Sequence, residues 1–164
     1  MKRSLLVYFI ALIFIFSACG KTTTYTCDPT PPAAVATAAE TSAIQSYLNS
    51  NGITATQDPS GFFYQILNPG TGTVTPTVCS NVVVTYIGTI MGGNGAPFDS
   101  NTTGVSFPLG NLIIGWQKGI PLIKKGGSIK LFIPPSMGYG ASASGSIPAN
   151  SYLIFNVSLL DVAN

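Results

Sequence analysis

Histidine is absent from this sequence of 164 residues, and its absence removes several classes of enzyme. Without an imidazole the chain cannot build a Ser-His-Asp or Cys-His catalytic group, and it cannot bind a metal ion through histidine. Charged side chains are also scarce, at only 7% of the residues. Few classes of enzyme remain, and we expect neither a metal site nor a cofactor.

The N-terminal apolar run is too short to cross a membrane. Residues 5–16 are about a dozen apolar residues behind a basic start, whereas a spanning helix needs roughly 20. This pattern predicts a signal peptide over residues 1–18. The segment closes with Phe-Ser-Ala-Cys, which resembles the lipobox of bacterial lipoproteins, in which the cysteine, here Cys19, is lipidated. The alternative is an ordinary cleaved signal peptide followed by a chance cysteine.

Basic residues are too few to indicate a nucleic-acid partner. Removal of Lys2 and Arg3 with the signal peptide reduces seven basic side chains to five, which equals the five acidic ones. The only basic pair left, Lys124-Lys125, is most simply a solvated turn, so we expect no binding to nucleic acid.

We expect a protein of the bacterial cell envelope, lipid-anchored to a membrane on the periplasmic or extracellular face.

Cysteine occurs three times. If Cys19 carries the lipid, Cys27 and Cys79 remain as a pair in a compartment where disulfides persist. We predict a bridge between them, and two separate free thiols are the alternative.

After the signal peptide the chain divides into three parts, namely a lipidated tether (19–36), an N-terminal helix with a linker (37–58) and one larger domain (59–164). The tether is rich in Thr, Pro and Ala and lacks periodicity. A helix is predicted over residues 38–51, because Thr37 and Glu40 have the spacing of a capping box. Its apolar stripe is formed by Ile44, Tyr47 and Leu48.

Abundant glycine (18) and proline (12) indicate a turn-rich β protein. Alternating or β-branched runs predict strands at 62–67, 82–87, 105–109, 128–133 and 152–162. The run at 82–87 is β-branched enough to be covered on both faces of a sheet. These strands, with short turns and few helices, predict an antiparallel, β-rich α+β domain.

One short helix is predicted at residues 111–119, where Asn111 could cap its start and Gly119 could adopt the left-handed conformation past its end. Pro121 then discourages extension. The segment is apolar nearly all round, so it must be buried, and it carries Trp116, the only tryptophan. A buried helix among strands implies a sheet curled around it.

Several short motifs occur in one order along the chain: Pro69-Gly-Thr-Gly72, Val84-Thr-Tyr-Ile-Gly88, Phe98-Asp-Ser100, Phe107-Pro-Leu109, Ile114-Gly-Trp116, Ile133-Pro-Pro135, Tyr139-Gly-Ala141 and residues 147–155. In this combination, over residues 59–162, the chain resembles the FKBP-type peptidyl-prolyl cis-trans isomerases. The resemblance implies a five- to six-stranded antiparallel sheet wrapped around one short helix, with a pocket between them.

The family's pocket can be carried over by position. The resemblance implies catalytic roles for Tyr86, Asp99, Trp116, Tyr139 and Phe155. It implies substrate binding by Phe98, Val105, Leu112, Ile113 and Ile147. Within this set Trp116 would be the floor, Tyr139 would place a hydroxyl at the rim, and Ile113 would bind a ligand carbonyl through its backbone N–H. The alternative is that the aromatic residues are plain core, and that Asp99 is a turn or capping residue rather than a partner of the Tyr86 hydroxyl.

The sequence departs from the family pattern at four places. Val105 stands where some relatives have an aromatic residue, Ile114 where Arg or Pro is frequent, and Ala149 where a second proline is usual. The loop 141–146 lacks the customary proline and bulky residues. These departures bear on substrate preference more than on activity.

Isomerisation of an X-Pro bond needs no histidine. The barrier of ~18–20 kcal/mol arises from amide resonance, so a dry apolar slot and placed hydrogen-bond donors suffice. The resemblance therefore implies an isomerase of proteins that fold outside the cytoplasm, with proline-containing polypeptides as substrates and the family's macrolides as inhibitors. A proline-recognising binding module or chaperone, and a structural role at the membrane, are the alternatives. We expect a monomer, because the N-terminal helix is too short to resemble the dimerisation domain of macrophage infectivity potentiator-like relatives.

Overall fold

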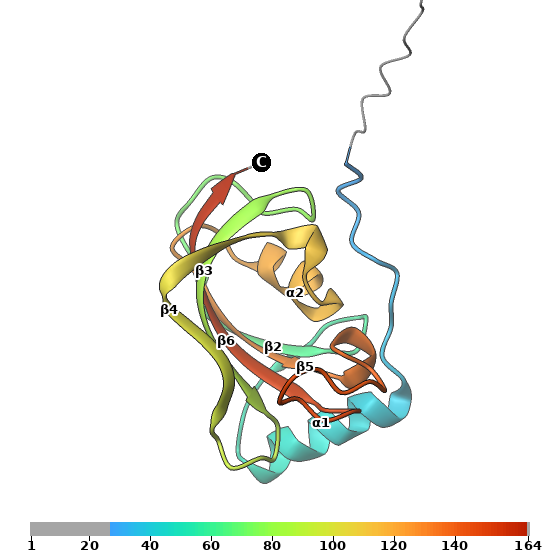
Figure 1. The fold of residues 1–164 in the computed structure, drawn as a ribbon. Coiled ribbons are helices and arrows are strands. Elements are labelled where there is room, and N and C mark those ends of the chain that lie inside the picture. The colour runs from blue at the N-terminus through green and yellow to red at the C-terminus, as the bar shows by residue number, and fades with distance from the viewer. Residues whose placement is uncertain (1–26, 164) are drawn as a thin grey trace, which may run out of the picture.

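Residues 27–163 are described by a computed structural model of the protein, shown in Figure 1. The predicted signal peptide, Cys19 and the first part of the tether lie outside the described residues. One six-stranded antiparallel sheet has the strand order β1-β2-β5-β6-β3-β4. This agrees with the predicted α+β class and with the strand number that the resemblance implied.

The strands are β1 (Thr56–Gln57), β2 (Phe63–Asn68), β3 (Asn81–Ile90), β4 (Pro97–Pro108), β5 (Ser128–Ile133) and β6 (Leu153–Ala163). The α-helices are α1 (Ala38–Ser50) and α2 (Ile114–Gly119). Within residues 27–163 there are also three short 3₁₀ helices: η1 (Leu109–Asn111), η2 (Ile120–Leu122) and η3 (Pro135–Met137). The two-residue strand β1 was not predicted from the sequence.

The concave face of the sheet holds α2, as Figure 1 shows. On β5, period-two alternation points Ile129, Leu131 and Ile133 into the core, where all three are fully buried. Helix and strand lie so close that a Cβ on Gly119 would be 2.5 Å from Leu131 Cδ2. Trp116 is only 4% exposed, so the indole is buried as predicted.

The start and end of α2 differ from the prediction. Asn111 belongs to η1 and does not cap α2; the N-cap residue is Ile113, which makes no side-chain cap bond. Gly119 has a right-handed φ of −82°, and the chain continues into η2 with Pro121 inside it. Proline is tolerated in the first turn of a helix, where its missing N–H has no partner to lose. Gly119 is thus required by close packing and not by a left-handed helix end.

The outer face of the sheet is covered in part by α1. Its start has the predicted capping box, with Glu40 N–H donating to Thr37 Oγ1 and Thr37 N–H donating to Glu40 Oε2. Ile44 and Leu48 pack against Phe63 of β2 and Phe132 of β5 in a small second core. The predicted helix over residues 38–51 is confirmed, although it ends one residue earlier, at Ser50.

The expectation that residues 82–87 are covered on both faces is wrong. Val82 and Val84 are fully buried on the concave side, but Ile87 on the other side is 39% exposed. The reason is that the residues packed against α1 come from β2, β5 and β6, so the helix does not extend over β3.

Residues 97–108 form one long strand, β4, where a short strand at 105–109 was predicted. Inside it, Asn101 Oδ1 accepts hydrogen bonds from the N–H groups of Thr103 and Gly104. The pairing with β3 shifts at this place, because Val84 is opposite Val105 whereas Tyr86 is opposite Asn101. A bulge of this kind interrupts the alternation from which strands are predicted.

The described part of the tether is joined to the domain. A disulfide links Cys27 to Cys79, with the Cα atoms 5.8 Å apart, and Ala36 N–H donates to Ser60 O at 2.8 Å. In Figure 1 the segment runs past α2 toward the start of α1. No helix within residues 27–163 is long and apolar enough to cross a membrane.

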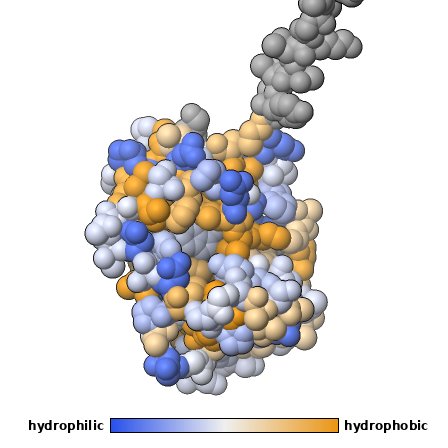
Figure 2. Space-filling view, in the orientation of Figure 1, coloured by the Kyte–Doolittle hydropathy of each residue, from blue (hydrophilic) through white to orange (hydrophobic). Residues whose placement is uncertain are grey.

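The surface carries few charges. On the face shown in Figure 2 the strongly hydrophilic residues are scattered among apolar ones and do not form one patch. Lys125 of the basic pair is exposed and forms an ion pair with Asp161 at 2.7 Å.

Candidate active site

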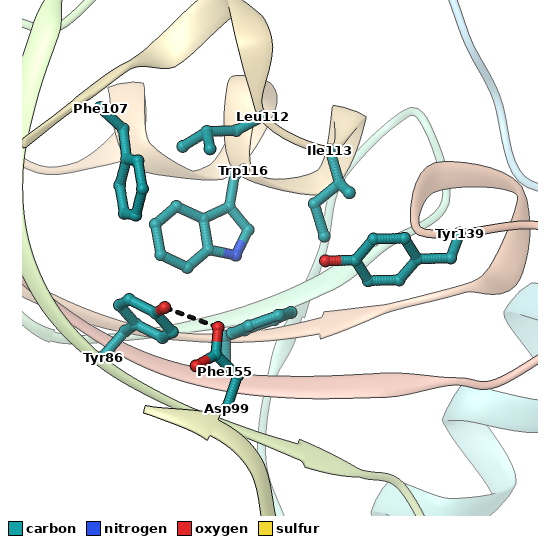
Figure 3. Close-up of a pocket in the computed structure, with 8 residues that line it drawn as sticks. All are labelled: Tyr86, Asp99, Phe107, Leu112, Ile113, Trp116, Tyr139 and Phe155. Atoms are coloured by element: carbon teal, nitrogen blue, oxygen red, sulfur yellow. Dashed lines mark hydrogen bonds between the residues drawn. The ribbon is translucent and has the colours of Figure 1, made fainter. Parts of the chain in front are cut away.

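A pocket of about 200 Å³ opens between α2 and the concave face of the sheet, as shown in Figure 3. Its lining consists of Tyr86, Asp99, Phe107, Leu112, Ile113, Trp116, Tyr139 and Phe155. The volume lies below the ~300–1,000 Å³ typical of pockets for drug-sized ligands. It suits a single compact apolar group.

The floor of the pocket is Trp116, held edge-on between two other rings. The ring centroids of Trp116 and Phe155 are 5.2 Å apart at 89°, and those of Trp116 and Tyr86 are 5.4 Å apart at 83°. Edge-to-face pairs of this kind are favourable and fix the ring orientations. The indole Nε1 is buried and has no hydrogen-bond partner among the described residues, and in Figure 3 it lies on the side of Ile113 and Tyr139.

A bulge in β4 turns two consecutive side chains toward the site. Gly88 of β3 is paired with Asp99 and the next residue, Thr89, with Pro97, so Phe98 is the extra residue. Phe98 and Asp99 can therefore both lie on the concave side. A side chain at Gly88 would not fit, because its Cβ would be 2.7 Å from both Phe155 Cε1 and Phe98 Cζ. The glycine thus makes room for two aromatic walls.

Asp99 is the only carboxylate among the lining residues, and it accepts a 2.6 Å hydrogen bond from the Tyr86 hydroxyl. Burial, the hydrogen bond and the negative charge of Asp99 together raise the pKa of Tyr86 to about 12. Burial, followed by the charge of Asp99, also raises the pKa of Tyr139. Both phenols are therefore neutral donors at neutral pH. Within residues 27–163, no group of three His, Cys, Asp or Glu side chains could hold a metal ion.

The segment between η1 and α2 is fixed by Gln117, whose role the sequence analysis missed. Its buried Nε2 donates to Gly110 O at 3.1 Å and to Leu112 O at 2.7 Å. The backbone N–H of Ile113 has no partner among the described residues, because the helix starts only at the next residue. This segment thus lines the pocket with two apolar residues, Leu112 and Ile113, and contains one backbone donor without a partner.

The model of the FKBP-type peptidyl-prolyl cis-trans isomerase family matches residues 72–160, which is more than half of the chain. The chain belongs to this family.

The FKBP-type domain has many similar sequences and structures. Isomerases named FkpA from Buchnera aphidicola (strain Sg) and Escherichia coli K12 are both 44% identical, over 64% and 63% of this chain and 42% and 38% of their own lengths. The crystal structure of Escherichia coli FkpA has a TM-score of 0.67 at 38% identity, covering 76% of this chain and 60% of that one. A Pseudomonas syringae isomerase structure has a TM-score of 0.66 at 26% identity, covering 81% of this chain and all of that one.

The chain spans about two fifths of the length of these curated FkpA relatives. The similarity therefore concerns the FKBP-type domain and does not extend to everything those proteins contain.

The FKBP-type pocket brings together most of the residues that the sequence singled out. Those lining it are Tyr86, Asp99, Leu112, Ile113, Trp116, Tyr139 and Phe155. Phe98 and Ile147 line a neighbouring cleft of about 230 Å³, which shares Asp99 and Tyr139 with the first. Ser144, Gly145 and Ser146 of the small-residue loop line the same cleft.

Val105, expected to bind substrate, does not line the pocket. Val105 packs against the main core, and Phe107, two residues later, supplies an aromatic wall. The ring centroid of Phe107 is 6.3 Å from that of Tyr86. The place of Phe107 could have been predicted from the sequence, because residues two apart in a strand, here Val105 and Phe107, share a face.

Proposed function

We propose that this protein catalyses cis–trans isomerisation of X-Pro bonds in polypeptides. The observation that carries the proposal is a pocket for one compact apolar ring, floored by Trp116 and bordered by Asp99 and by neutral tyrosine hydroxyls. A pyrrolidine ring on the indole would lie between Tyr86 and Phe155. The reaction breaks no bond and transfers no proton, so the missing histidine is no obstacle.

The site would act by favouring the twisted amide. The planar, resonance-stabilised amide carries more charge on its oxygen than the twisted form does. Exclusion of water by the aromatic walls, and the negative charge of Asp99 beside the bond, would both disfavour the planar form relative to the twisted one. Ile113 N–H would bind a substrate carbonyl and hold the chain while the bond rotates.

Tyr139 would supply a further donor. Its side chain is 40% exposed at the rim, and in Figure 3 its hydroxyl is directed toward the pocket. The hydroxyl has no partner among the described residues, so it can donate to a peptide carbonyl without giving up another bond.

A protease-coupled assay on a series of X-Pro peptides tests this proposal. We expect saturable acceleration, strongest for apolar X because Leu112 and Ile113 border the pocket. Tyr139→Phe should lower kcat/KM up to about tenfold, the effect of one lost hydrogen bond. The matched control is Tyr152→Phe, since Tyr152 packs near α1 and not in the pocket. Binding of proline peptides without acceleration by the wild-type protein would instead favour a binding module.

We also propose that the protein is a monomer that acts on proline-containing proteins. In this proposal a lipid on Cys19 anchors it at the outside of a bacterial membrane. The lipobox-like sequence supports the anchor. The disulfide at Cys27 leaves seven residues, 20–26, between anchor and bridge, and the eight steps from Cys19 to Cys27 reach at most about 28 Å. Cys19→Ala should release the protein into the soluble fraction or leave an unprocessed precursor. Membrane attachment unchanged by this substitution would contradict the anchor.

A further inference from the structure

One carboxylate joins α1 to the segment that precedes Tyr139. Glu40 Oε1 accepts a hydrogen bond from Ser136 N–H, and Glu40 Oε2 accepts one from the Ser136 hydroxyl, both at 2.9 Å. The same carboxylate accepts Thr37 N–H and the Thr37 hydroxyl at the start of α1. The residues joined are 96 positions apart in the chain. A side chain that would be expected only to cap a helix thus also connects two distant segments.

Glu40 is firmly held on its own side. Helix α1 packs Ile44 and Leu48 onto the sheet, and both are almost completely buried. Just before the helix, Ala36 N–H donates to Ser60 O at 2.8 Å. The carboxylate is therefore attached to a rigid support, which allows it to restrain what it binds.

On the other side, a chain of backbone bonds leads from Ser136 to the pocket rim. Ser136 is the central residue of η3, and Gly140 N–H donates back to Pro135 O at 2.9 Å. Gly140 O accepts Asn150 N–H at 2.8 Å, which closes the loop. Tyr139 lies between η3 and Gly140. Because its side chain is 40% exposed, its position depends on this backbone more than on packing.

We propose that Glu40 is a positioning residue for Tyr139, and that α1 supports the FKBP-type pocket rather than serving only as a spacer to the tether. Glu40 fixes η3 against α1, and η3 in turn fixes the backbone from which the Tyr139 hydroxyl reaches the substrate. The catalytic part of this inference rests on the proposed isomerase function. The structural part, that the Glu40–Ser136 contact orders the loop, does not.

One substitution breaks the paired contact, a second weakens it, and one matched substitution spares it. Glu40→Gln replaces one of the two carboxylate oxygens with an NH2 group, which cannot accept, whereas the N–H groups of Thr37 and Ser136 bind different oxygens. Ser136→Ala removes only the hydroxyl bond, because the backbone N–H still donates to Glu40 Oε1, and it leaves α1 intact. Thr37→Ala is the control, because it removes the cap of α1, at a cost of about 1 kcal/mol, but leaves Ser136 bound to Glu40.

Amide hydrogen exchange tests the inference without reference to activity. In Glu40→Gln we expect protection of the Gly140 and Asn150 amides to fall about tenfold, and in Ser136→Ala to fall less, with amides in the core of the sheet unchanged. Thr37→Ala should leave both loop amides protected. Equal protection in wild type and Glu40→Gln, or equal loss in Thr37→Ala, would overturn the inference.

Kinetics on an X-Pro peptide then test the link to Tyr139. We expect Glu40→Gln to lower kcat/KM about fivefold and Ser136→Ala to lower it less, both mainly through KM. Both should have little further effect in a Tyr139→Phe background. Losses that simply add to that of Tyr139→Phe would contradict a role through Tyr139. If wild type were inactive, the proposed function would fail, while the exchange experiment would still decide whether Glu40 orders the loop.

Discussion

At the scale of single residues, the pair Asp99 and Tyr86 gives the pocket its polarity. The carboxylate accepts a hydrogen bond from the Tyr86 hydroxyl, with an oxygen–oxygen distance of 2.6 Å. The pKa of Tyr86 is raised to about 12, with burial as the largest cause and Asp99 as the next. A group whose pKa is raised on folding contributes stability that is complete below its unfolded pKa, about 10, and is lost as the pH rises toward 12.

Asp99→Asn should keep the hydrogen bond geometry but remove the charge. We expect kcat/KM to fall about tenfold, because a charge-assisted bond is replaced by a neutral one and the planar amide is no longer penalised. The pKa of Tyr86 should drop, since the neighbouring negative charge is gone. Ultraviolet titration of the tyrosines and circular dichroism check the pKa and the fold. A variant as active as wild type would show that the apolar walls alone carry catalysis.

The sequence pointed to Phe98 and Asp99 only through the family resemblance. Alternation along a strand would place them on opposite faces, and it is the bulge opposite Gly88 that allows both to approach the pocket. Gln117 was missed for a related reason. A polar residue in an apolar helix gives no sign of which carbonyl groups it binds until the loop beside it is folded.

At the scale of elements, α2 is placed by two glycines. A Cβ on Gly115 would be 2.6 Å from Ile133 Cδ1, and one on Gly119 would be 2.5 Å from Leu131 Cδ2. The helix and its burial were predictable from the apolar pattern. Its cap and its end were not predictable. Residue 119 is glycine because α2 packs closely against β5, and not because of a local helix-end signal.

Gly119→Ala should destabilise the protein by about 1–3 kcal/mol. Its backbone is helical, so alanine brings a propensity gain of at most about 1 kcal/mol, which the clash with Leu131 outweighs. Chemical denaturation measures the difference. In a Leu131→Ala background, where the space is open, the same substitution should cost much less. A Gly119→Ala protein more stable than wild type would show that α2 can move away from β5 freely.

Helix α1 should make the protein sensitive to acid. Burial alone would raise the pKa of Glu40, but the hydrogen bonds from Thr37 and Ser136 outweigh it and hold the pKa below its usual value of 4.5. The stability from this group is present above about pH 4.5 and is lost as the pH falls through the lowered pKa. Thermal melts of wild type and Glu40→Gln between pH 7 and pH 3 should therefore converge at the acid end. A constant difference in melting temperature would contradict this.

At the scale of the whole molecule, the disulfide joins the tether to the start of β3. It closes a loop with a sequence separation of 52 residues, which the chain-entropy model values at about 4 kcal/mol. We expect the Cys27→Ser, Cys79→Ser double variant to unfold at a correspondingly lower denaturant concentration. Mass spectrometry of the oxidised protein should show a gain of two hydrogens on reduction. An unchanged mass would mean that the two thiols are free.

The cysteine count predicted which residues would pair, because once Cys19 is assigned to the lipid only two remain. It could not predict that the bridge brings the described tether along the side of α2, where Pro29 and Pro31 share a hollow with Gln117 and Pro121. That arrangement depends on chain segments far apart in the sequence, and apolar periodicity carries no information about it.

Isomerase activity is tested most directly by magnetisation-exchange NMR on a proline peptide at equilibrium, with the oxidised protein added in catalytic amount. We expect separate cis and trans signals whose exchange rate rises in proportion to the protein concentration. We also expect the fluorescence of Trp116, the only tryptophan, to change as peptide fills the pocket. Folded, oxidised protein that leaves the exchange rate at its uncatalysed value for every X-Pro peptide would show that the pocket does not catalyse isomerisation.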